Sequence, residues 1–191
     1  MIYLRIMFGV VRKFIWDLLE VVIVSAVVVL PIRQFLVQPF FVQGQSMEPN
    51  FHNSDYLIID ELTYRLREPQ RGEVVVFKFP GDTSQYYIKR IIGLPGETLE
   101  IERNRIIVFN REYPGGLAIK EDYLDESSRQ ADLGKTKITL GEDEFYVLGD
   151  NRRSSYDSRR WGVLPRSDIV GRVWVRAWPV NAVAAFSAPA Y

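Results

Sequence analysis

Residues 73–96 have the sequence EVVVFKFPGDTSQYYIKRIIGLPG, in which two apolar runs are separated by turn-forming residues. The runs from Glu73 to Phe79 and from Tyr86 to Ile92 contain the β-branched and aromatic residues that favour strands. Pro80-Gly81 lies between the runs and Leu94-Pro95-Gly96 follows them, and both are typical turn signals. The stretch therefore predicts two consecutive strands.

The same pattern continues on both sides of this stretch. Further strands are predicted over Tyr56 to Ile59, Ile106 to Phe109, Phe145 to Leu148 and Ile169 to Trp178. After Ile32 there is no helical period of useful length, apart from a turn near Glu61 to Leu66. We therefore expect a mainly β fold, with an antiparallel β-sheet domain over residues 37–191. Residues 97–141 are more polar and too short for a core of their own, so we expect a small β insertion there.

The composition excludes several classes of function. The 191 residues include 24 Lys plus Arg and 24 Asp plus Glu, so the formal net charge is zero. Nucleic-acid binding depends on a basic excess that meets phosphates, so this balance argues against a nucleic-acid partner. The chain has no cysteine, which excludes disulfides, thiol nucleophiles, iron–sulfur clusters and cysteine-based zinc sites. His52 is the single histidine, so a Ser-His-Asp mechanism would depend on that residue alone.

A long apolar run precedes the predicted strands. Residues 14–32 have the sequence FIWDLLEVVIVSAVVVLPI, which as a helix would span about 28 Å, close to the thickness of a bilayer's hydrocarbon core. A buried strand or core helix is the alternative, because β-branched residues are frequent in the run. Strands rarely exceed about 10 residues, however. We therefore predict one transmembrane helix within residues 14–36.

The charges around this run predict its orientation. More basic residues precede it than follow it closely: Arg5, Arg12 and Lys13 on one side, and Arg33 on the other. By the positive-inside rule, residues 1–13 stay in the cytoplasm and residues 37–191 lie on the extracytoplasmic face. A cleavable signal peptide is the alternative, but residues 30–35 (LPIRQF) lack the small residues that cleavage needs. We expect an uncleaved anchor.

The segment Gly44-Gln45-Ser46-Met47-Glu48-Pro49 carries the first chemical signal. Gly44 frees the backbone and Pro49 prevents the chain from continuing as a central strand, so Ser46 is predicted on a bend. There its hydroxyl can be presented and its own N–H can point at a reacting oxygen. An ordinary polar turn is the alternative.

The second signal is Lys89, which lies inside an otherwise apolar strand. Burial disfavours the ammonium form, and a neutral lysine amine is a competent general base. The alternative is that Lys89 faces solvent and pairs with a carboxylate. Together, Ser46 and Lys89 suggest a dyad in which Ser46 attacks and Lys89 accepts its proton. His52 lies in a polar stretch and is expected at a surface turn.

A third element is the loop from Gly149 to Arg159, which is dense in short polar residues directly after a predicted strand. Such a loop is typically held by local hydrogen bonds. A metal site is the rival interpretation, but Asp150 and Asp157 are its only charged oxygen ligands and arginines flank them. We expect no metal.

Together these features resemble type I signal peptidase, the membrane-bound Ser–Lys endopeptidase that removes signal peptides from exported proteins. The resemblance covers most of the chain. Besides the anchor, it rests on Ser46-Met47-Glu48-Pro49, Arg71-Gly72-Glu73-Val74-Val75-Val76-Phe77, Tyr87-Ile88-Lys89-Arg90-Ile91-Ile92-Gly93 with Pro95-Gly96-Glu97, the Gly149 to Arg159 loop, and Gly171-Arg172 leading to Trp178-Pro179.

The resemblance implies roles for the central residues. Ser46 would be the nucleophile and Lys89 the general base. Ser155 matches a serine whose hydroxyl holds the lysine amine in place. Gly44 stands where some members have a serine that helps to form the oxyanion hole, so the hole would rest largely on the Ser46 N–H.

Two ion pairs around the lysine also follow from the resemblance. Asp150 would pair with Arg90, and Asp157 with Arg159. Asp157 matches an aspartate that supports the site without performing the chemistry. We expect these pairs to set the geometry of the loop more than its stability.

The resemblance further implies the substrates and the location. The substrates would be secretory preproteins with small side chains, commonly alanine, at the first and third positions before the cut. The family's pocket-lining positions match or neighbour Phe40, Val42, Met47, Phe51, Tyr87 and Ile88. The endoplasmic-reticulum branch has histidine in place of Lys89, so we expect a bacterial inner-membrane enzyme that contacts the bilayer and needs no cofactor.

Two other functions remain open. Self-cleaving repressors use a Ser–Lys dyad on a related β-fold, but they carry a DNA-binding helical domain where this chain has a predicted anchor. A membrane-anchored β-domain that binds a partner without catalysis is the other. It predicts that Ser46→Ala and Lys89→Ala leave function intact.

Overall fold

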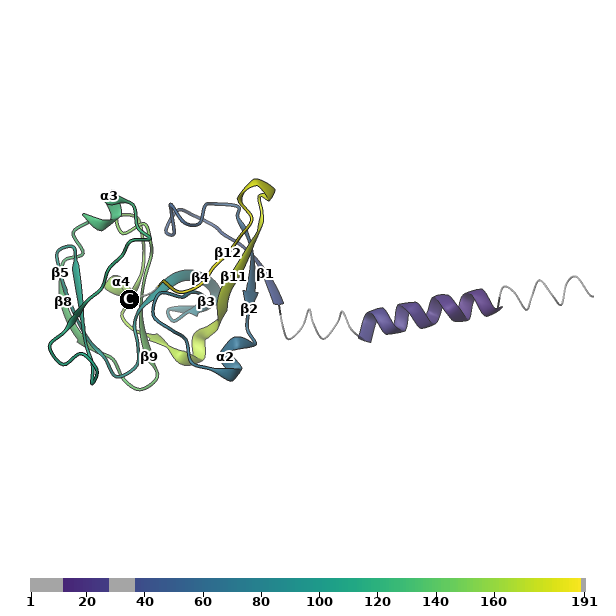
Figure 1. The fold of residues 1–191 in the computed structure, drawn as a ribbon, viewed down its shortest axis with the longest axis horizontal. Helices are drawn as coiled ribbons and strands as arrows, with labels where there is room; N and C mark the ends of the chain where they lie inside the picture. Colours follow the sequence, from purple (N-terminus) through teal and green to yellow (C-terminus); the bar gives the residue numbers. More distant parts are fainter. Residues whose placement is uncertain (1–11, 28–36, 190–191) are drawn as a thin grey trace, which may run out of the picture. The chain divides into compact units, whose positions relative to one another are not determined.

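The computed structural model describes residues 12–27 and 37–189 (Figure 1). The chain divides into two compact units, residues 1–38 and residues 39–191. Residues 12–27 form a helix. Within the described ranges, no helix combines the length and apolar composition needed to cross a bilayer. The predicted anchor, residues 14–36, is described only up to residue 27, and most of the predicted cytoplasmic segment, residues 1–13, also lies outside the described residues.

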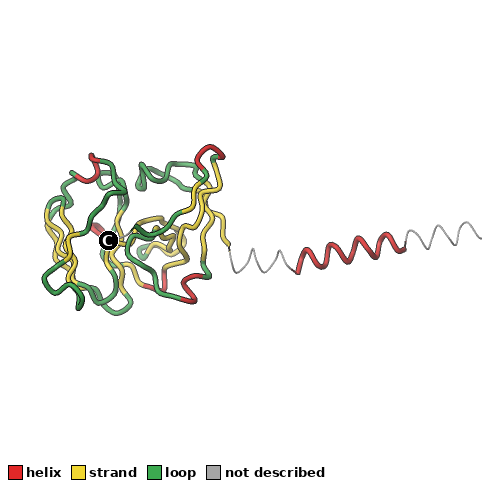
Figure 2. The backbone as a smooth tube through the Cα atoms, viewed as in Figure 1, coloured by secondary structure: helices red, strands yellow, loops and turns green. Residues whose placement is uncertain are grey.

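From residue 37 onward, the described chain consists mainly of strands joined by loops, with a few short helices (Figure 2). The strands are β1 (Val37–Phe41), β2 (Tyr56–Asp60), β3 (Val74–Phe79), β4 (Asp82–Gly93), β5 (Thr98–Glu102), β6 (Arg105–Phe109), β7 (Leu117–Ala118), β8 (Lys135–Thr139), β9 (Glu144–Leu148), β10 (Leu164–Pro165), β11 (Ile169–Trp178) and β12 (Ala184–Ala185). The helices are α2 (Thr63–Leu66), α3 (Glu126–Arg129), α4 (Ser158–Trp161), η1 (Arg166–Asp168) and η2 (Val180–Ala182).

These elements confirm the mainly β prediction. Each of the six predicted strands is present, and α2 coincides with the predicted turn near residues 61–66. The strand predicted over Tyr86 to Ile92 is longer than expected, because its polar first residues pair with the end of β3. The strands β5 and β8 were not predicted individually, since each contains only a few apolar residues among charged and polar ones.

The larger sheet has the order β1-β2-β11-β3-β4-β9-β10, with β12 paired to β11. Its described pairings are antiparallel, and the two consecutive strands that the sequence predicts, β3 and β4, form a hairpin with Val75 opposite Lys89. β9 pairs with β4 from Arg90 onward, whereas among the described residues the preceding part of β4 is paired on its β3 side only. β1 is the edge strand at one end of the order. Within residues 12–27 and 37–189, both β1 and the first part of β4 therefore have a free edge.

A second sheet, with the order β7-β6-β5-β8, is formed within residues 98–139. Its apolar side chains share one core cluster with Ile92 of β4 and with Tyr146 and Leu148 of β9. Gly93 lies where the two sheets approach, and a Cβ there would come within 2.5 Å of Leu99 Cδ1. A side chain at this position would therefore push the sheets apart.

Candidate active site

Ser46 lies on the turn that follows β1. The turn begins at Gly44, whose φ of +89° lies in the left-handed region that glycine adopts freely, and whose N–H donates to Asn53 Oδ1 at 2.9 Å. The carbonyl of Ser46 accepts from the Asn151 N–H at 3.0 Å, and the Asn151 side-chain amide donates to the Gln45 carbonyl at 3.1 Å. The loop after β9 thus fixes the backbone at Gln45 and Ser46.

Lys89 lies on β4, immediately before the residues that pair with β9. Its side chain reaches across to the turn after β1, and its Nζ donates to Ser46 Oγ at 2.9 Å. A second donation goes to the Ile88 carbonyl at 2.8 Å. The residue is only 4% exposed. The structure therefore brings Ser46 and Lys89 into hydrogen-bond contact although they are far apart in the sequence.

Burial lowers the pKa of Lys89 from 10.5 to about 8, because the ammonium loses its hydration. The charges of Asp157 and Asp150 act in the opposite direction. Both carboxylates form ion pairs with arginines instead of with the lysine. With a pKa near 8, about a tenth of the amine is neutral at pH 7, far more than for an ordinary lysine.

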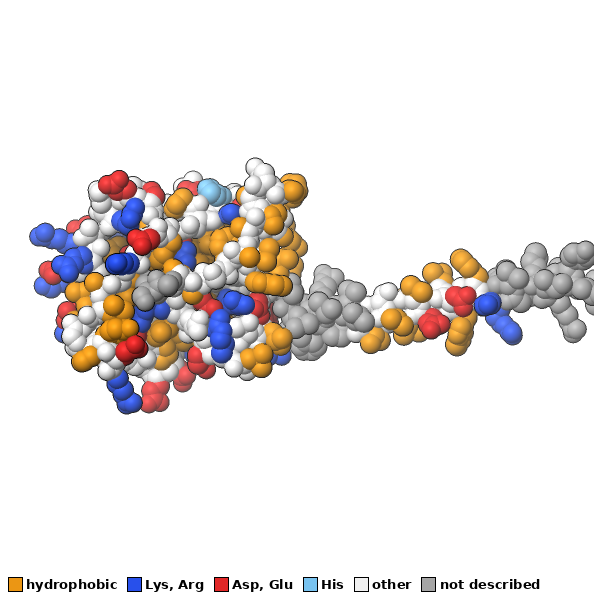
Figure 3. Space-filling model, in the orientation of Figure 1, with side chains coloured by type: hydrophobic (Ala, Val, Ile, Leu, Met, Phe, Trp, Pro, Cys, Tyr) orange, Lys and Arg blue, Asp and Glu red, His pale blue; other side chains and the backbone are white. Residues whose placement is uncertain are grey.

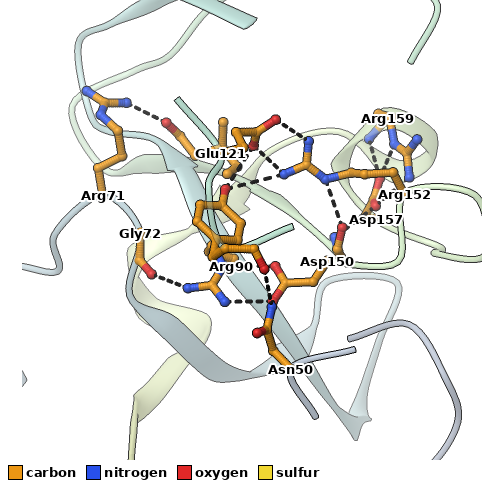
Figure 4. A network of polar contacts seen from close by, with 12 residues as sticks. Asn50, Arg71, Gly72, Arg90, Glu121, Asp150, Arg152, Asp157 and Arg159 are labelled. Carbon is orange, nitrogen blue, oxygen red and sulfur yellow. Dashed lines mark hydrogen bonds and ion pairs between the residues drawn. The ribbon is translucent and has the colours of Figure 1, made fainter. Parts of the chain in front are cut away.

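Arg90, the next residue along β4, forms a buried ion pair. Its Nε and Nη2 donate to the two carboxylate oxygens of Asp150 at 2.8 and 2.6 Å, and its Nη1 donates to the Gly72 carbonyl at 2.8 Å (Figure 4). Asn50 donates to the same carboxylate at 2.8 Å. Asp150 is fully buried, so this pairing fixes the start of the loop that follows β9.

Asp157 lies at the other end of this loop, where it caps α4. Burial alone would raise its pKa, but the Arg159 guanidinium and the Gly149 N–H stabilise the carboxylate and lower the pKa overall. Ser155 contributes to this lowering, although its hydroxyl does not meet the geometry of a hydrogen bond with any group in the described part of the chain. Ser155 is therefore close to this carboxylate, and no hydrogen bond joins it to Lys89 in this structure.

Gly149 brings the loop against the serine turn. A Cβ on this residue would lie 2.2 Å from Ser155 Oγ and 2.5 Å from the Ser46 carbonyl oxygen, both impossible contacts. Only glycine allows the two segments to approach this closely. Gly149 is thus required by packing at the point where Ser46 and Ser155 meet.

Beside Ser46 and Lys89 lies a cleft of about 760 Å³, lined on one side by the β1 end and on the other by the first part of β4. The lining residues are Phe40, Phe41, Val42, Gln43, Gly44, Gln45, Ser46, Leu57, Val76, Gln85, Tyr86, Tyr87, Ile88, Lys89, Ser154 and Tyr156. Most of this surface is apolar, and its lining includes the Ser46 hydroxyl and the Lys89 amine that contact each other. The arrangement suits an extended chain whose backbone passes the Ser46 hydroxyl.

A buried amine that contacts a cleft-lining hydroxyl is the arrangement expected of a serine nucleophile with a lysine base. Over residues 15–178, the chain matches the family model described as "Signal peptidase, peptidase S26". It belongs to that family. Among the residues described here, no cluster of three or more His, Asp or Glu side chains could hold a metal ion.

Several bacterial relatives are similar over most of their length. The chain is 36% identical to a probable signal peptidase I-2 of Synechocystis sp., covering 87% of this chain and 75% of the relative. It is 34% identical to signal peptidase I P of Bacillus subtilis subsp. natto, covering 84% and 87%. A crystal structure of a signal peptidase I from Enterococcus faecalis, 30% identical, covers 56% of this chain and 97% of its own, with a TM-score of 0.48. The chain is thus a serine endopeptidase of a family that removes signal peptides from preproteins.

The predicted substrate-binding residues divide into two groups. Phe40, Val42, Tyr87 and Ile88 line the cleft. Met47 and Phe51 are 1% and 0% exposed and pack in the core cluster of Val42, Leu57 and Val76. The latter two side chains thus support the cleft wall from within the core.

Sequence reasoning missed several residues of the site. Tyr86, Gln85 and Tyr156 line the cleft; Tyr86 and Tyr156 adjoin predicted site residues, and Gln85 lies two positions before Tyr87. Asn50 carried no signal, and Asn151 was noted only as part of the polar loop after a predicted strand, because the partners of the two side chains are 100 and 106 positions away along the chain.

Proposed function

We propose that this chain is a membrane-bound endopeptidase that removes N-terminal signal peptides from exported preproteins, with Ser46 as nucleophile and Lys89 as general base. The observation that carries the proposal is the 2.9 Å contact between Lys89 Nζ and Ser46 Oγ in the lining of the cleft. The family of the chain supplies the class of substrate.

The reaction proceeds by acyl transfer. Neutral Lys89 takes the Ser46 proton as the hydroxyl oxygen attacks the scissile carbonyl, and then gives it to the leaving amine. The resulting ester is hydrolysed by a water molecule that Lys89 activates in the same way. The Ser46 N–H stabilises the developing oxyanion, since Gly44 has no hydroxyl to offer.

The substrate binds as an added strand. β1 and the first part of β4 each have a free edge, and residues of both line the cleft. An extended peptide between them can bond to exposed backbone groups while alternate side chains enter the cleft walls. Phe40, Val42 and Ile88 narrow these walls, which favours small side chains near the cut, and Ser155 and Asp157 hold the loop behind Lys89.

The anchor places enzyme and substrate in the same bilayer. Residues 14–32 are mostly apolar, and the described helix exposes large apolar side chains such as Trp16 and Val21. On residues 39–189, exposed apolar side chains gather where β1, β11 and β12 lie (Figure 3). They include Phe41, Trp174, Trp178, Val180 and Val183. We infer a single-pass protein of the bacterial inner membrane, with residues 1–13 in the cytoplasm and the cleft on the extracytoplasmic face.

Cleavage of a purified secretory precursor tests the dyad. Ser46→Ala and Lys89→Ala should each lower kcat/KM by about 10³-fold or more, because each removes a group that takes part in the chemical step. Ser84→Ala on β4 and Lys78→Ala on β3 are matched controls, since both residues are exposed and outside the cleft lining. They should cleave like the unchanged protein.

The pH profile tests the base. Because only the neutral amine accepts a proton, kcat/KM should rise with pH and reach half its maximum near pH 8, the pKa of Lys89. A flat profile from pH 6 to 10, with chemistry limiting, would exclude a lysine base. Cleavage that survives in Ser46→Ala would exclude the nucleophile, and folded protein that cleaves no precursor would favour a binding module.

A further inference from the structure

The insertion contacts the catalytic centre through the short segment Glu121-Asp122-Tyr123, which precedes α3 and belongs to none of the strands. The ring of Tyr123 lies over the guanidinium of Arg90, whose Cζ is 4.1 Å from the ring centroid. Arg90 is the immediate neighbour of Lys89 on β4 and is 5% exposed. The ring therefore covers a face of a buried cation next to the proposed base.

The same segment contacts the chain on the side of the nucleophile. The Tyr123 carbonyl accepts from Asn50 Nδ2 at 3.0 Å, and this amide also donates to Asp150 at 2.8 Å. Asn50 belongs to the turn segment that carries Ser46. One side-chain amide thus joins the insertion, the serine turn and the carboxylate that holds Arg90.

A third contact reaches the loop after β9. Glu121 accepts from both terminal nitrogens of Arg152, whose Nε donates to the Gly149 carbonyl at 3.0 Å (Figure 4). The Tyr123 hydroxyl donates to the same Glu121 carboxylate at 2.8 Å. Arg152 is 2% exposed, so its charge depends on this partner. The segment is therefore attached to the lysine strand, the serine turn and the loop that packs against both.

We propose that Tyr123, held by Glu121, is a positioning residue of the proteolytic reaction: its ring keeps Arg90 and Asp150 packed, and this packing holds the loop after β9 in place, so that Ser46 and Lys89 stay within reach of each other. The proposal rests on the proposed function, because it takes the Ser46–Lys89 contact as the reacting pair. It gives residues 121–123 of the insertion a part in catalysis without contact to the substrate.

Replacing the ring tests this role in the full chain, with a secretory precursor as substrate. Tyr123→Leu removes the ring, and desolvated cation–ring contacts of this kind correspond to roughly 5- to 30-fold in a rate. We expect kcat to fall by that factor with KM nearly unchanged, since the cleft is not altered. Loosening the Arg90–Asp150 pair should also leave the Asp150 charge less compensated, which favours the ammonium form of Lys89 and raises its pKa, so the half-maximal pH should move upward from about 8.

Two further variants separate positioning from folding. Tyr123→Phe keeps the ring and loses the hydroxyl, which donates to Glu121 and accepts a longer bond from Arg152, so it should restore most of kcat and the original half-maximal pH. Tyr113→Leu is the matched control, because the backbone contacts of Tyr113 stay within its own turn of the insertion. It should leave kcat and the pH profile unchanged.

Each outcome supports or contradicts the proposed role of Tyr123. Partial unfolding would scale kcat equally at every pH, so a reduced kcat with an unmoved half-maximal pH would overturn the proposal. It would also be overturned if Tyr123→Leu cleaved normally, or if Tyr123→Phe were as impaired as Tyr123→Leu. These failures differ from failure of the dyad, which would appear as cleavage that does not depend on Ser46 and Lys89.

Discussion

β4 buries one cation on each of its faces, and the two cations have different kinds of partner. On one face, Arg90 has a carboxylate with both oxygens engaged, a backbone carbonyl and an aromatic ring around its guanidinium. On the other, Lys89 is equally buried, yet its hydrogen bonds go to a serine hydroxyl and a carbonyl. A paired buried cation stays charged, whereas an unpaired one gives up its proton more easily. In the proposed mechanism, successive residues of one strand therefore serve as a fixed charge and as a base.

The largest loss of activity is expected when the buried lysine is replaced by the other kind of cation, an arginine. In Lys89→Arg the guanidinium keeps its proton at every accessible pH, so it cannot accept one from Ser46. We expect kcat to fall by about 10³-fold, as for removal of the base altogether. Precursor cleavage measures the loss, and the thermal unfolding midpoint shows how much protein is folded.

The converse exchange is the control for this prediction. Arg90→Lys keeps a positive charge next to Asp150 but cannot keep all three hydrogen bonds that the guanidinium donates to Asp150 and to the Gly72 carbonyl. Its kcat should fall by less than about tenfold. If Lys89→Arg kept a tenth or more of the original kcat, the charge state of Lys89 would not matter to the reaction.

The sequence alone allows Lys89 and its strand to be predicted, but not the groups that surround Arg90. Lys89 stands out because an apolar strand surrounds it, and the turn at Gly44 and Pro49 predicts where Ser46 bends away from β1. The strands β3, β4 and β11 follow equally well from their apolar runs. These features are local, so one sequence suffices to find them.

What surrounds Arg90 is not local. Asp150 was found only through the resemblance to a family, and Tyr123 belongs to a polar insertion whose pattern gives no reason to place it beside β4. The individual strands β5 and β8 were missed for a related reason. Their alternating apolar residues are few, and their burial depends on β4 and β9 covering them.

Removing the partner of Arg90 should have the next largest effect. Asp150→Asn leaves a buried guanidinium without a countercharge, which typically lowers the free energy of unfolding by about 3–5 kcal/mol. It also removes a negative charge that favours the ammonium form of Lys89, so the half-maximal pH of cleavage should fall below about 8. Denaturant unfolding and the pH profile measure the two effects.

An exposed carboxylate provides the control for Asp150. Asp143→Asn, in the turn before β9, makes the same change of charge at the surface, and its stability should stay within about 0.5 kcal/mol of the unchanged protein. Equal stability of the two variants would mean that Arg90 does not depend on its carboxylate. A half-maximal pH that rises in Asp150→Asn would contradict the electrostatic account of Lys89.

The smallest effect is expected at an ion pair that is just as short but lies on the surface. Lys137 of β8 and Glu100 of β5 are 2.5 Å apart, against 2.6 Å for Arg90 and Asp150, but their side chains are 68% and 36% exposed. Water and salt screen such a pair, so a double-mutant cycle with Lys137→Gln and Glu100→Gln should give a coupling below about 1 kcal/mol that shrinks at high salt. A coupling as large as that of the buried pair would mean that distance alone governs these interactions. Since the two distances are nearly equal, a small coupling here would assign the difference to burial, the same property that lowers the pKa of Lys89.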